Sequence, residues 1–422
     1  TISGDDITNL HSLHTITSVG SLFISCNDVL TNLDGLSNLT IVGNTCHTCF
    51  MSGLSIAGNP ALTNLHSLSS LSRVEGSLQI SNNDELTNLK GLEGITSIGA
   101  MLDITGNAKL TNIKALSSVA TVGVLLLTSQ SVLINDNPSL TRIDVLNEIT
   151  SLRGELQIKN NASLTKIDGF SSLTKIQGER ANVTITDNPL LTNLNGFAAL
   201  DTILGTRRGG LITISNNASL TNLDGFSSLT VIEPGISGGL VISNNQALTE
   251  VDGLANFIRI TSGGSFYLKV IDNPMLDRGC GLYPLLHNNG VGGGWCDSST
   301  CPFITISGNG PNFTRESILS GGSCTPDCPI NNTVVFAEIS SSCSSPFSTT
   351  IIIPHPEANV MYTLRDNQDN RVVAGPSSGS EGFPTGQISE TTTYNILARN
   401  SVTGCEVVLA TLPVVSINSF PL

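Results

Sequence analysis

The chain has 422 residues, of which 39% are hydrophobic and only 12% are charged, and its formal net charge is −14. This negative balance repels the phosphate backbone of nucleic acids and argues against them as partners, and there is no window of about 18 apolar residues that would insert into a membrane. The ten cysteines favour disulfides in an oxidising compartment, so we expect an extracellular or cell-surface protein.

The first feature along the chain is a repeat built on a Leu-Thr-x-Leu motif. The chain opens inside a repeat, at Thr1-Ile2, so we expect a processed or partial product. Successive motifs begin 24 to 32 residues apart, and a period of this size is typical of a solenoid. The opening leucine recurs as Leu30, Leu62, Leu86, Leu110, Leu140, Leu164, Leu191, Leu220, Leu248 and Leu276.

Each repeat contains three short apolar clusters, Leu-x-Ile, Leu-x-x-Leu-x-x-Leu and Ile-x-x-Ile. The two-residue spacing in Leu78-Gln79-Ile80 predicts a strand, so we expect three short strands per coil and about eleven coils. An asparagine follows each Leu-x-Ile cluster, and we expect it to point inward and hydrogen-bond to the next coil. This predicted ladder comprises Asn27, Asn59, Asn82, Asn107, Asn137, Asn160, Asn188, Asn216, Asn244, Asn273 and Asn309.

The pattern Leu-x-Ile-x-Asn-Asn-x-x-Leu-Thr-x-Leu-x-Gly-Leu resembles the receptor L-domain type of leucine-rich repeat found in surface proteins of Bacteroidota. The resemblance covers residues 1 to 324 and implies a right-handed leucine-rich β-solenoid. It also implies an adhesion or binding protein, exported by the type IX route, rather than an enzyme. The partners would be other surface proteins, glycans or copies of the chain. A subunit of an extracellular filament or sheath is the alternative, and a polysaccharide-active enzyme is a second one.

The repeats differ by insertions at one corner, between the Ile-x-x-Ile cluster and the next Leu-x-Ile cluster. Insertions at one register of a solenoid stack along one edge, and such edges often bind partners. Tolerated loops with no ligand are an equally weighted alternative. The candidate binding residues on this edge are Asn44, His47, Thr48, Ser129, Gln130, Arg180, Arg207, Arg208 and Ser237.

Two further columns recur in the Leu-Thr-x-Leu part of the repeat. The first carries carboxylates before the glycine, at Asp144, Asp168, Asp224 and Asp252, which we interpret as solvated charges, with Ca²⁺ binding as the alternative. Asp144 and Asp168 would be the natural carboxylate pair of a glycosidase, although the resemblance argues against one. The second column is the threonine itself, for which organising ice is a minor alternative. The sequence thus predicts no catalytic, cofactor or metal site.

Cysteines gather in two places in the repeat region. Cys46, His47 and Cys49, with Cys26 one coil earlier, could form a metal site, but a disulfide within this loop or back to Cys26 is the better interpretation. The segment from Cys280 to Cys324 is similar to the C-terminal cap of the bacterial arrays. We expect disulfides to staple this cap, at about residues 277–328, through Cys280, Cys296, Cys301, Cys324 and Cys328.

The repeat stops near residue 328, and residues 329–422 contain six or seven short β-forming segments separated by turns. Such a pattern predicts a β-sandwich. The segment from Thr391 to Cys405 is similar to the Ig-like modules that follow repeats in Bacteroidota surface adhesins. The resemblance implies a connector module with a disulfide between Cys343 and Cys405. We therefore expect two domains, 1–328 and 329–422, in an all-β protein.

Overall fold

The computed structural model describes residues 1–43, 53–123, 132–207, 209–235, 237–260, 265–287 and 304–321, together with shorter segments between 350 and 415. The chain divides into two compact units, Thr1–Cys324 and Thr325–Leu422. Both are built mainly from strands. No helix among the described residues is long and apolar enough to cross a membrane.

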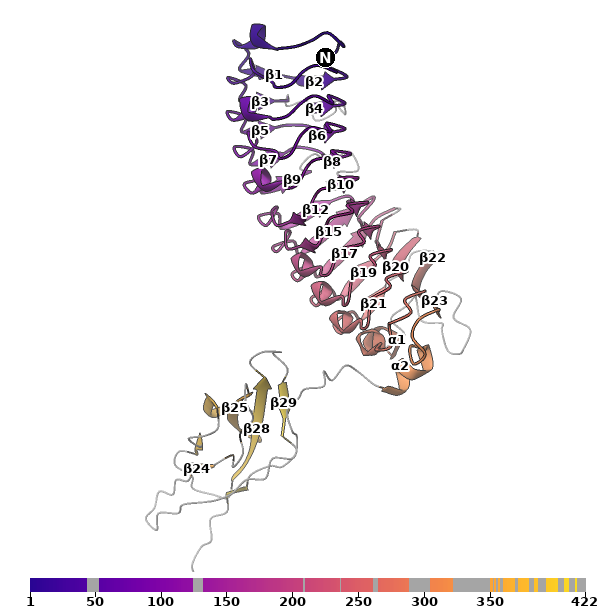
Figure 1. Cartoon of the computed structure of the whole chain (residues 1–422). Helices are drawn as coiled ribbons and strands as arrows, with labels where there is room; N and C mark the ends of the chain where they lie inside the picture. The colour runs from indigo at the N-terminus through magenta and orange to yellow at the C-terminus, as the bar shows by residue number, and fades with distance from the viewer. Residues whose placement is uncertain are drawn as a thin grey trace, which may run out of the picture. The chain divides into compact units, whose positions relative to one another are not determined.

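The first unit is a β-solenoid, and one side of it is a parallel sheet of eleven strands, here called the large sheet (Figure 1). Each strand pairs with the equivalent strand of the next coil, so that Ile56 lies beside Ile80. The strands, in spatial order, are β2 (Ser21–Ser25), β4 (Gly53–Ala57), β6 (Ser77–Ser81), β8 (Leu102–Thr105), β10 (Val132–Asn135), β13 (Leu156–Lys159), β16 (Asn182–Thr186), β18 (Leu211–Ser215), β20 (Ser237–Ser243), β22 (Ser265–Ile271) and β23 (Ile304–Ser307).

The second side consists of two shorter parallel sheets. The first contains β1 (Ser18–Val19), β3 (Ile41–Val42), β5 (Arg73–Val74), β7 (Ser97–Ile98) and β9 (Thr121–Val122), and the second contains β12 (Ser151–Arg153), β15 (Lys175–Gly178), β17 (Thr202–Gly205), β19 (Val231–Glu233) and β21 (Arg259–Ile260). Among the described residues, β23 has no counterpart on this side. The expected number of about eleven regular coils is therefore not reached.

The third side was expected to be a strand in every coil, and this prediction is wrong for most of them. Short 3₁₀ helices form there instead. An asparagine two residues before the helix accepts a hydrogen bond from the backbone N–H of the first helical residue, as Asn112 does from Lys114 (3.4 Å) and Asn222 from Asp224 (3.2 Å). This Asx turn favours tight turns over extended backbone. The 3₁₀ helices are η1 (His11–Leu13), η2 (His66–Leu68), η3 (Lys114–Leu116), η4 (Asn195–Phe197), η5 (Asp224–Phe226), η6 (Asp252–Leu254) and η7 (Cys280–Leu282).

Two consecutive coils keep the predicted third strand. In these coils a basic residue, Arg142 or Lys166, replaces the turn-forming asparagine. The strands β11 (Arg142–Ile143) and β14 (Lys166–Ile167) form there and pair with each other. The asparagine precedes five of the seven 3₁₀ helices that the structure describes, but η6 and η7 form after Glu250 and Arg278, so this residue favours the 3₁₀ helix without deciding the choice alone.

The inward asparagine ladder exists, but its predicted register is wrong in four coils. Asn82, Asn160, Asn216 and Asn244 have φ values of 54° to 57°, in the left-handed region. This conformation turns the chain so that the following residue points inward. The inward residues in those coils are Asn83, Asn161, Asn217 and Asn245, each fully buried.

Each ladder asparagine connects three coils. Asn137 Nδ2 donates to the carbonyl of Ile104 in the preceding coil (2.9 Å), and its backbone N–H donates to Oδ1 of Asn161 in the next coil (3.1 Å). The hydrogen bonds satisfy polar groups that are excluded from water. On the third side, the buried rings of Phe170, Phe197 and Phe226 from successive coils stack with ring centroids 5.7 Å apart.

The solenoid ends in two short helices, α1 (Tyr283–His287) and α2 (Arg315–Gly321). Phe313 and Ile318 are buried against the last coil and cover its apolar end. The described helices fall within the predicted cap.

The second unit has antiparallel strands and a core of its own around Tyr362, Phe383 and Tyr394. One sheet has the order β26 (Val372–Ser377), β25 (Val360–Asp366), β28 (Thr392–Asn400) and β29 (Glu406–Val408), with β30 (Val414–Val415) also paired to β28. A separate pair is formed by β24 (Thr350–Ile351) and β27 (Phe383–Pro384). The strands described do not define two stacked sheets, so the Ig-like sandwich stays a prediction.

Candidate functional site

Each insertion precedes a strand of the large sheet in the sequence, and those that the structure describes, before β16, β18 and β20, lie along one edge of this sheet. In the described part, the loops of successive coils hydrogen-bond to one another: Thr206 N–H donates to Gly178 (3.0 Å), and Gly235 N–H donates to Gly209 (3.1 Å). Arg207 Nη1 lies 3.4 Å from Glu179 Oε1. The insertions before β16, β18 and β20 therefore form a continuous edge.

The structure places only some of the predicted edge residues. Arg180 and Arg207 are exposed on the edge, and Ser237 begins β20. Asn44, His47, Thr48, Ser129, Gln130 and Arg208 lie outside the described residues. Binding by this edge stays a prediction.

Beside the edge lies the outer face of the large sheet, which the sequence analysis did not single out. The signal was present, because the middle residue of each Leu-x-Ile cluster must point away from the core when its neighbours point inward. These middle residues form one continuous row: Phe23, Ser55, Gln79, Asp103, Leu133, Gln157, Thr184, Thr213, Val241, Lys269 and Thr305. Only Asp103 and Lys269 in this row are charged.

Polar side chains on the outer face are connected across strands. Ser55 Oγ donates to Gln79 Oε1 (2.8 Å), and Gln79 Nε2 donates to Asp103 Oδ2 (3.1 Å). Thr105 Oγ1 donates to the other oxygen of Asp103 (2.5 Å). At the far end, Lys269 Nζ lies 4.8 Å from the ring centroid of Tyr267. The face offers hydroxyl and amide groups with little net charge.

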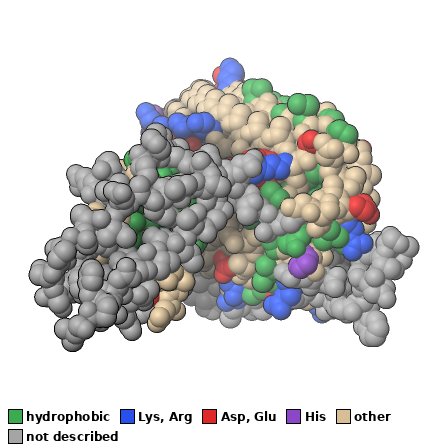
Figure 2. Space-filling view, turned by 90° about the horizontal axis from the view of Figure 1, so that it is seen from below, with side chains coloured by type: hydrophobic (Ala, Val, Ile, Leu, Met, Phe, Trp, Pro, Cys, Tyr) green, Lys and Arg blue, Asp and Glu red, His purple; other side chains and the backbone are tan. Residues whose placement is uncertain are grey.

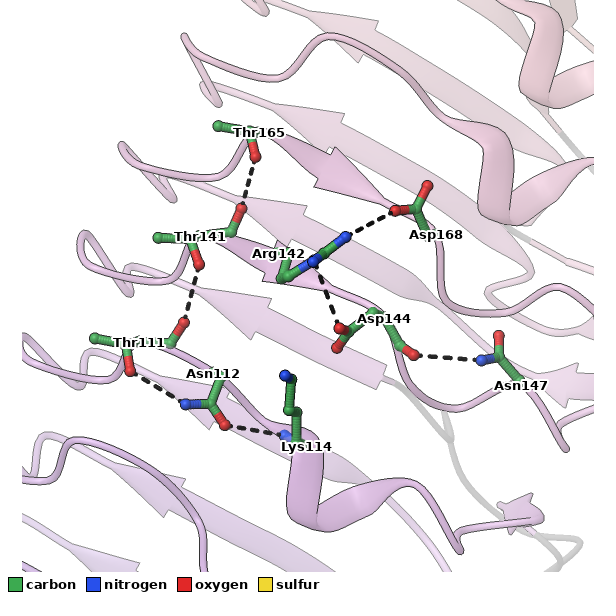
Figure 3. Close-up of polar contacts among 9 residues, drawn as sticks. All are labelled: Thr111, Asn112, Lys114, Thr141, Arg142, Asp144, Asn147, Thr165 and Asp168. Atoms are coloured by element: carbon green, nitrogen blue, oxygen red, sulfur yellow. Dashed lines mark hydrogen bonds and ion pairs between the residues drawn. The ribbon is translucent and has the colours of Figure 1, made fainter.

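The hydroxyls of the threonine column on the third side donate hydrogen bonds to the preceding coil. Thr165 Oγ1 donates to the carbonyl of Thr141 (3.0 Å), and Thr141 Oγ1 donates to that of Thr111 (3.4 Å), as Figure 3 shows. Asn112 Nδ2 in turn donates to Thr111 Oγ1 (3.2 Å). With their protons used in this way, the hydroxyls are poorly placed to organise ice.

The carboxylate column is held by arginines at two places. The Arg142 guanidinium lies 3.5 Å from both Asp144 and Asp168 (Figure 3), and Arg278 lies 3.0 Å from Asp252 and 3.7 Å from Glu250. Asp144 and Asp168 are thus both engaged by one guanidinium. Among the described residues, no three His, Cys, Asp or Glu side chains are grouped to hold a metal ion.

At Asp224, which remains exposed, partial desolvation by burial raises the pKa of the carboxyl. A raised pKa means that folding disfavours the charged form, so the unfavourable term is absent below the ordinary aspartate pKa and grows as the pH rises. We expect Asp224→Asn to raise the urea midpoint at pH 7 and to have no effect at acidic pH. Asn195 occupies the same position one coil earlier, so an amide fits there.

Asp168→Asn is the matched control, since it removes a carboxylate that Arg142 pairs with. It should leave the midpoint at pH 7 unchanged or lower it. An equal gain in stability from both variants would show that general charge repulsion, rather than burial of Asp224, is the cause.

Of the predicted disulfide cysteines, two lie in the described residues. Cys26 is exposed and its thiol is free; its φ is 55°. Because the thiol is free, pairing within the loop remains as the disulfide alternative for Cys46 and Cys49. Cys280 begins η7. The others, Cys46, Cys49, Cys296, Cys301, Cys324, Cys328, Cys343 and Cys405, lie outside the described residues, and their pairing stays a prediction.

Charges are sparse on the surface as a whole. On the face seen in Figure 2, lysine, arginine and carboxylate side chains lie singly or in small groups among uncharged atoms. The negative balance of the chain is thus not gathered into one patch on this face.

Residues 141–222 match the family model described as the Receptor L domain. The match covers the coils from Thr141 to Asn222 and agrees with the solenoid found there. Comparison with curated proteins and comparison with solved structures each gave no match. A β-solenoid of the receptor L-domain kind indicates a binding or surface protein.

Proposed function

We propose that the solenoid is an extracellular recognition module, carried by an adhesin-like protein, and that it binds its partner over the outer face of the large sheet and the adjoining insertion edge. The observation that carries the proposal is the position of the insertions, every one of which precedes a strand of the large sheet. The variable part of each coil therefore lies at the corner where the second side meets the large sheet. Binding sites are commonly built from variable loops on a rigid scaffold.

The third side is less suited to binding a partner. The threonine hydroxyls and asparagine amides of the third side already have partners within the solenoid. The outer face carries hydroxyls, amides and a few apolar side chains, some of them hydrogen-bonded across strands, and such groups suit an uncharged partner such as a glycan or another surface protein. Receptor L domains are typically extracellular, which supports the proposed location.

Recognition is a better proposal than catalysis for this surface. The most natural carboxylate pair, Asp144 and Asp168, lies on the third side and shares one arginine. The outer row holds one carboxylate, Asp103, whose two oxygens both accept hydrogen bonds from neighbouring side chains.

The test uses two variants in one coil. The whole chain is screened on an array of glycans and polysaccharides and against surface proteins of neighbouring cells, and binding is then measured by biolayer interferometry. Thr213→Arg places a large charged side chain in the middle of the outer row, and we expect it to weaken binding about tenfold or more. Ser228→Arg alters an exposed turn after η5 and should leave binding unchanged. Full binding by Thr213→Arg, or an equal loss in both variants, would contradict the proposal.

A further inference from the structure

The stacking of the solenoid is interrupted at one step, between β9 and β12. On either side of this step the backbone is bonded as usual: Gly123 N–H donates to Ile98 (3.0 Å), and Thr174 N–H donates to Thr150 (3.0 Å). Across the step, no backbone hydrogen bond joins residues 119–123 to residues 149–154, all of which are described. Gly154 N–H instead donates forward, to Gln177 (2.9 Å).

The other two sides hold the coils together at the same step. The large sheet continues without a gap, because β10 pairs with both β8 and β13. On the third side, Thr141 is bonded to Thr111 by its N–H (3.3 Å) and its hydroxyl (3.4 Å), whereas the corresponding bonds from Thr165 to Thr141 measure 2.9 and 3.0 Å. The backbone hydrogen bonding at this step is therefore complete in the large sheet, longer on the third side and absent between β9 and β12.

The two coils after the step are wound differently from the others. They contain β11 and β14 in place of 3₁₀ helices, and the buried residues Leu146 and Phe170 have φ values of 68° and 66°. Bulky side chains rarely adopt this left-handed conformation, and it persists only where the surroundings impose it. Arg142 ties these coils to each other through Asp168, and no ion pair among the described residues ties them to the coil before.

We infer that the step between β9 and β12 is a hinge. Residues 1–123 form one body, and the coils from β10 onward form the other. The large sheet joins the two bodies and bends where they meet. Figure 1 shows the stack of coils changing direction at this place. Bending at the hinge opens or closes the gap between β9 and β12, and it changes the curvature of the outer face. The inference concerns the scaffold and does not depend on what the face binds.

Two pairs of spin labels on the whole chain test the hinge. One pair, at Ser97 and Thr202, spans the step, and the control pair, at Ser151 and Arg259, spans the same number of strands within one sheet. A strand spacing of about 4.8 Å puts the control pair about 19 Å apart, and the pair that spans the step lies at that distance or farther, because one of its intervals has no strand pairing. Labels are introduced through an unnatural amino acid, because Cys26 is a free thiol.

We expect the pair that spans the step to give a distance distribution about twice as wide as that of the control pair, since only this pair crosses the hinge. Hydrogen exchange of the unlabelled chain provides the second measurement: the amides of Thr150 and Arg153, which face the step, should exchange about tenfold or more faster than those of Thr174 and Gln177, which donate back to β12. Equal widths for the two pairs would overturn the hinge, and so would equal protection of the two sets of amides.

Discussion

Replacing Asn161 by alanine is expected to lower the free energy of unfolding of the solenoid by at least about 3 kcal/mol. The Asn161 side chain is fully buried; its Nδ2 donates to the Ile134 carbonyl (2.9 Å) and to Asn188 Oδ1 (3.2 Å), and its Oδ1 accepts from the Asn137 backbone N–H (3.1 Å). Alanine leaves these partners without a hydrogen bond in a region that water does not reach. Urea denaturation followed by circular dichroism measures the loss.

Its neighbour Asn160 provides the control. Asn160 is exposed and has a φ of 56°, so Asn160→Gly keeps the backbone conformation and removes only a surface contact with Asp136. We expect a change of less than about 0.5 kcal/mol. The comparison also tests the register, because a larger loss from Asn160→Gly than from Asn161→Ala would mean that Asn160 is the ladder residue.

The second large effect is expected at the centre of the aromatic stack. Phe197 is fully buried, and its ring lies 5.7 Å from both Phe170 and Phe226. Phe197→Ala removes both ring contacts and leaves a cavity, which should cost about 3–5 kcal/mol of unfolding free energy. Thermal and urea unfolding of the purified chain both report it.

Phe197→Leu is the matched substitution. The equivalent position holds leucine in other coils, such as Leu68 and Leu116, so leucine fits the backbone there. It should cost only about 1 kcal/mol. If leucine and alanine were equally damaging, the ring stack itself, rather than the filling of space, would dominate the stability of these coils.

The period of the repeat made the solenoid predictable, because Leu-x-Ile clusters at 24-residue spacing leave few other ways to bury their side chains. The third side was not predictable from apolar spacing alone. There asparagines such as Asn112 favour the turn because they accept its N–H, but η6 and η7 form without one, after Glu250 and Arg278. The register of Asn82 and Asn83 failed for a similar reason, because a left-handed residue reverses which neighbour points inward.

The candidate site was predicted only as an edge. The insertions could be located by comparing repeat lengths, which placed Arg180 and Arg207 correctly beside the large sheet. The outer row through Thr213 and Val241 was accessible from strand alternation, but its one aromatic residue and its two charged residues, Phe23, Asp103 and Lys269, are scattered and form no cluster that the sequence would reveal. The interruption between β9 and β12 consists of missing backbone hydrogen bonds between two coils, and no residue pattern in the sequence indicates it.

The asparagine ladder also has an evolutionary consequence. Each coil presents the same donors to one neighbour and the same acceptor to the other, as Asn59 and Asn83 do. At the ladder one coil can therefore replace another, and whole units can be gained or lost without redesigning the ladder contacts that remain. The protein can change its length, and with it the extent of its recognition surface, while the chemistry that joins its parts stays the same.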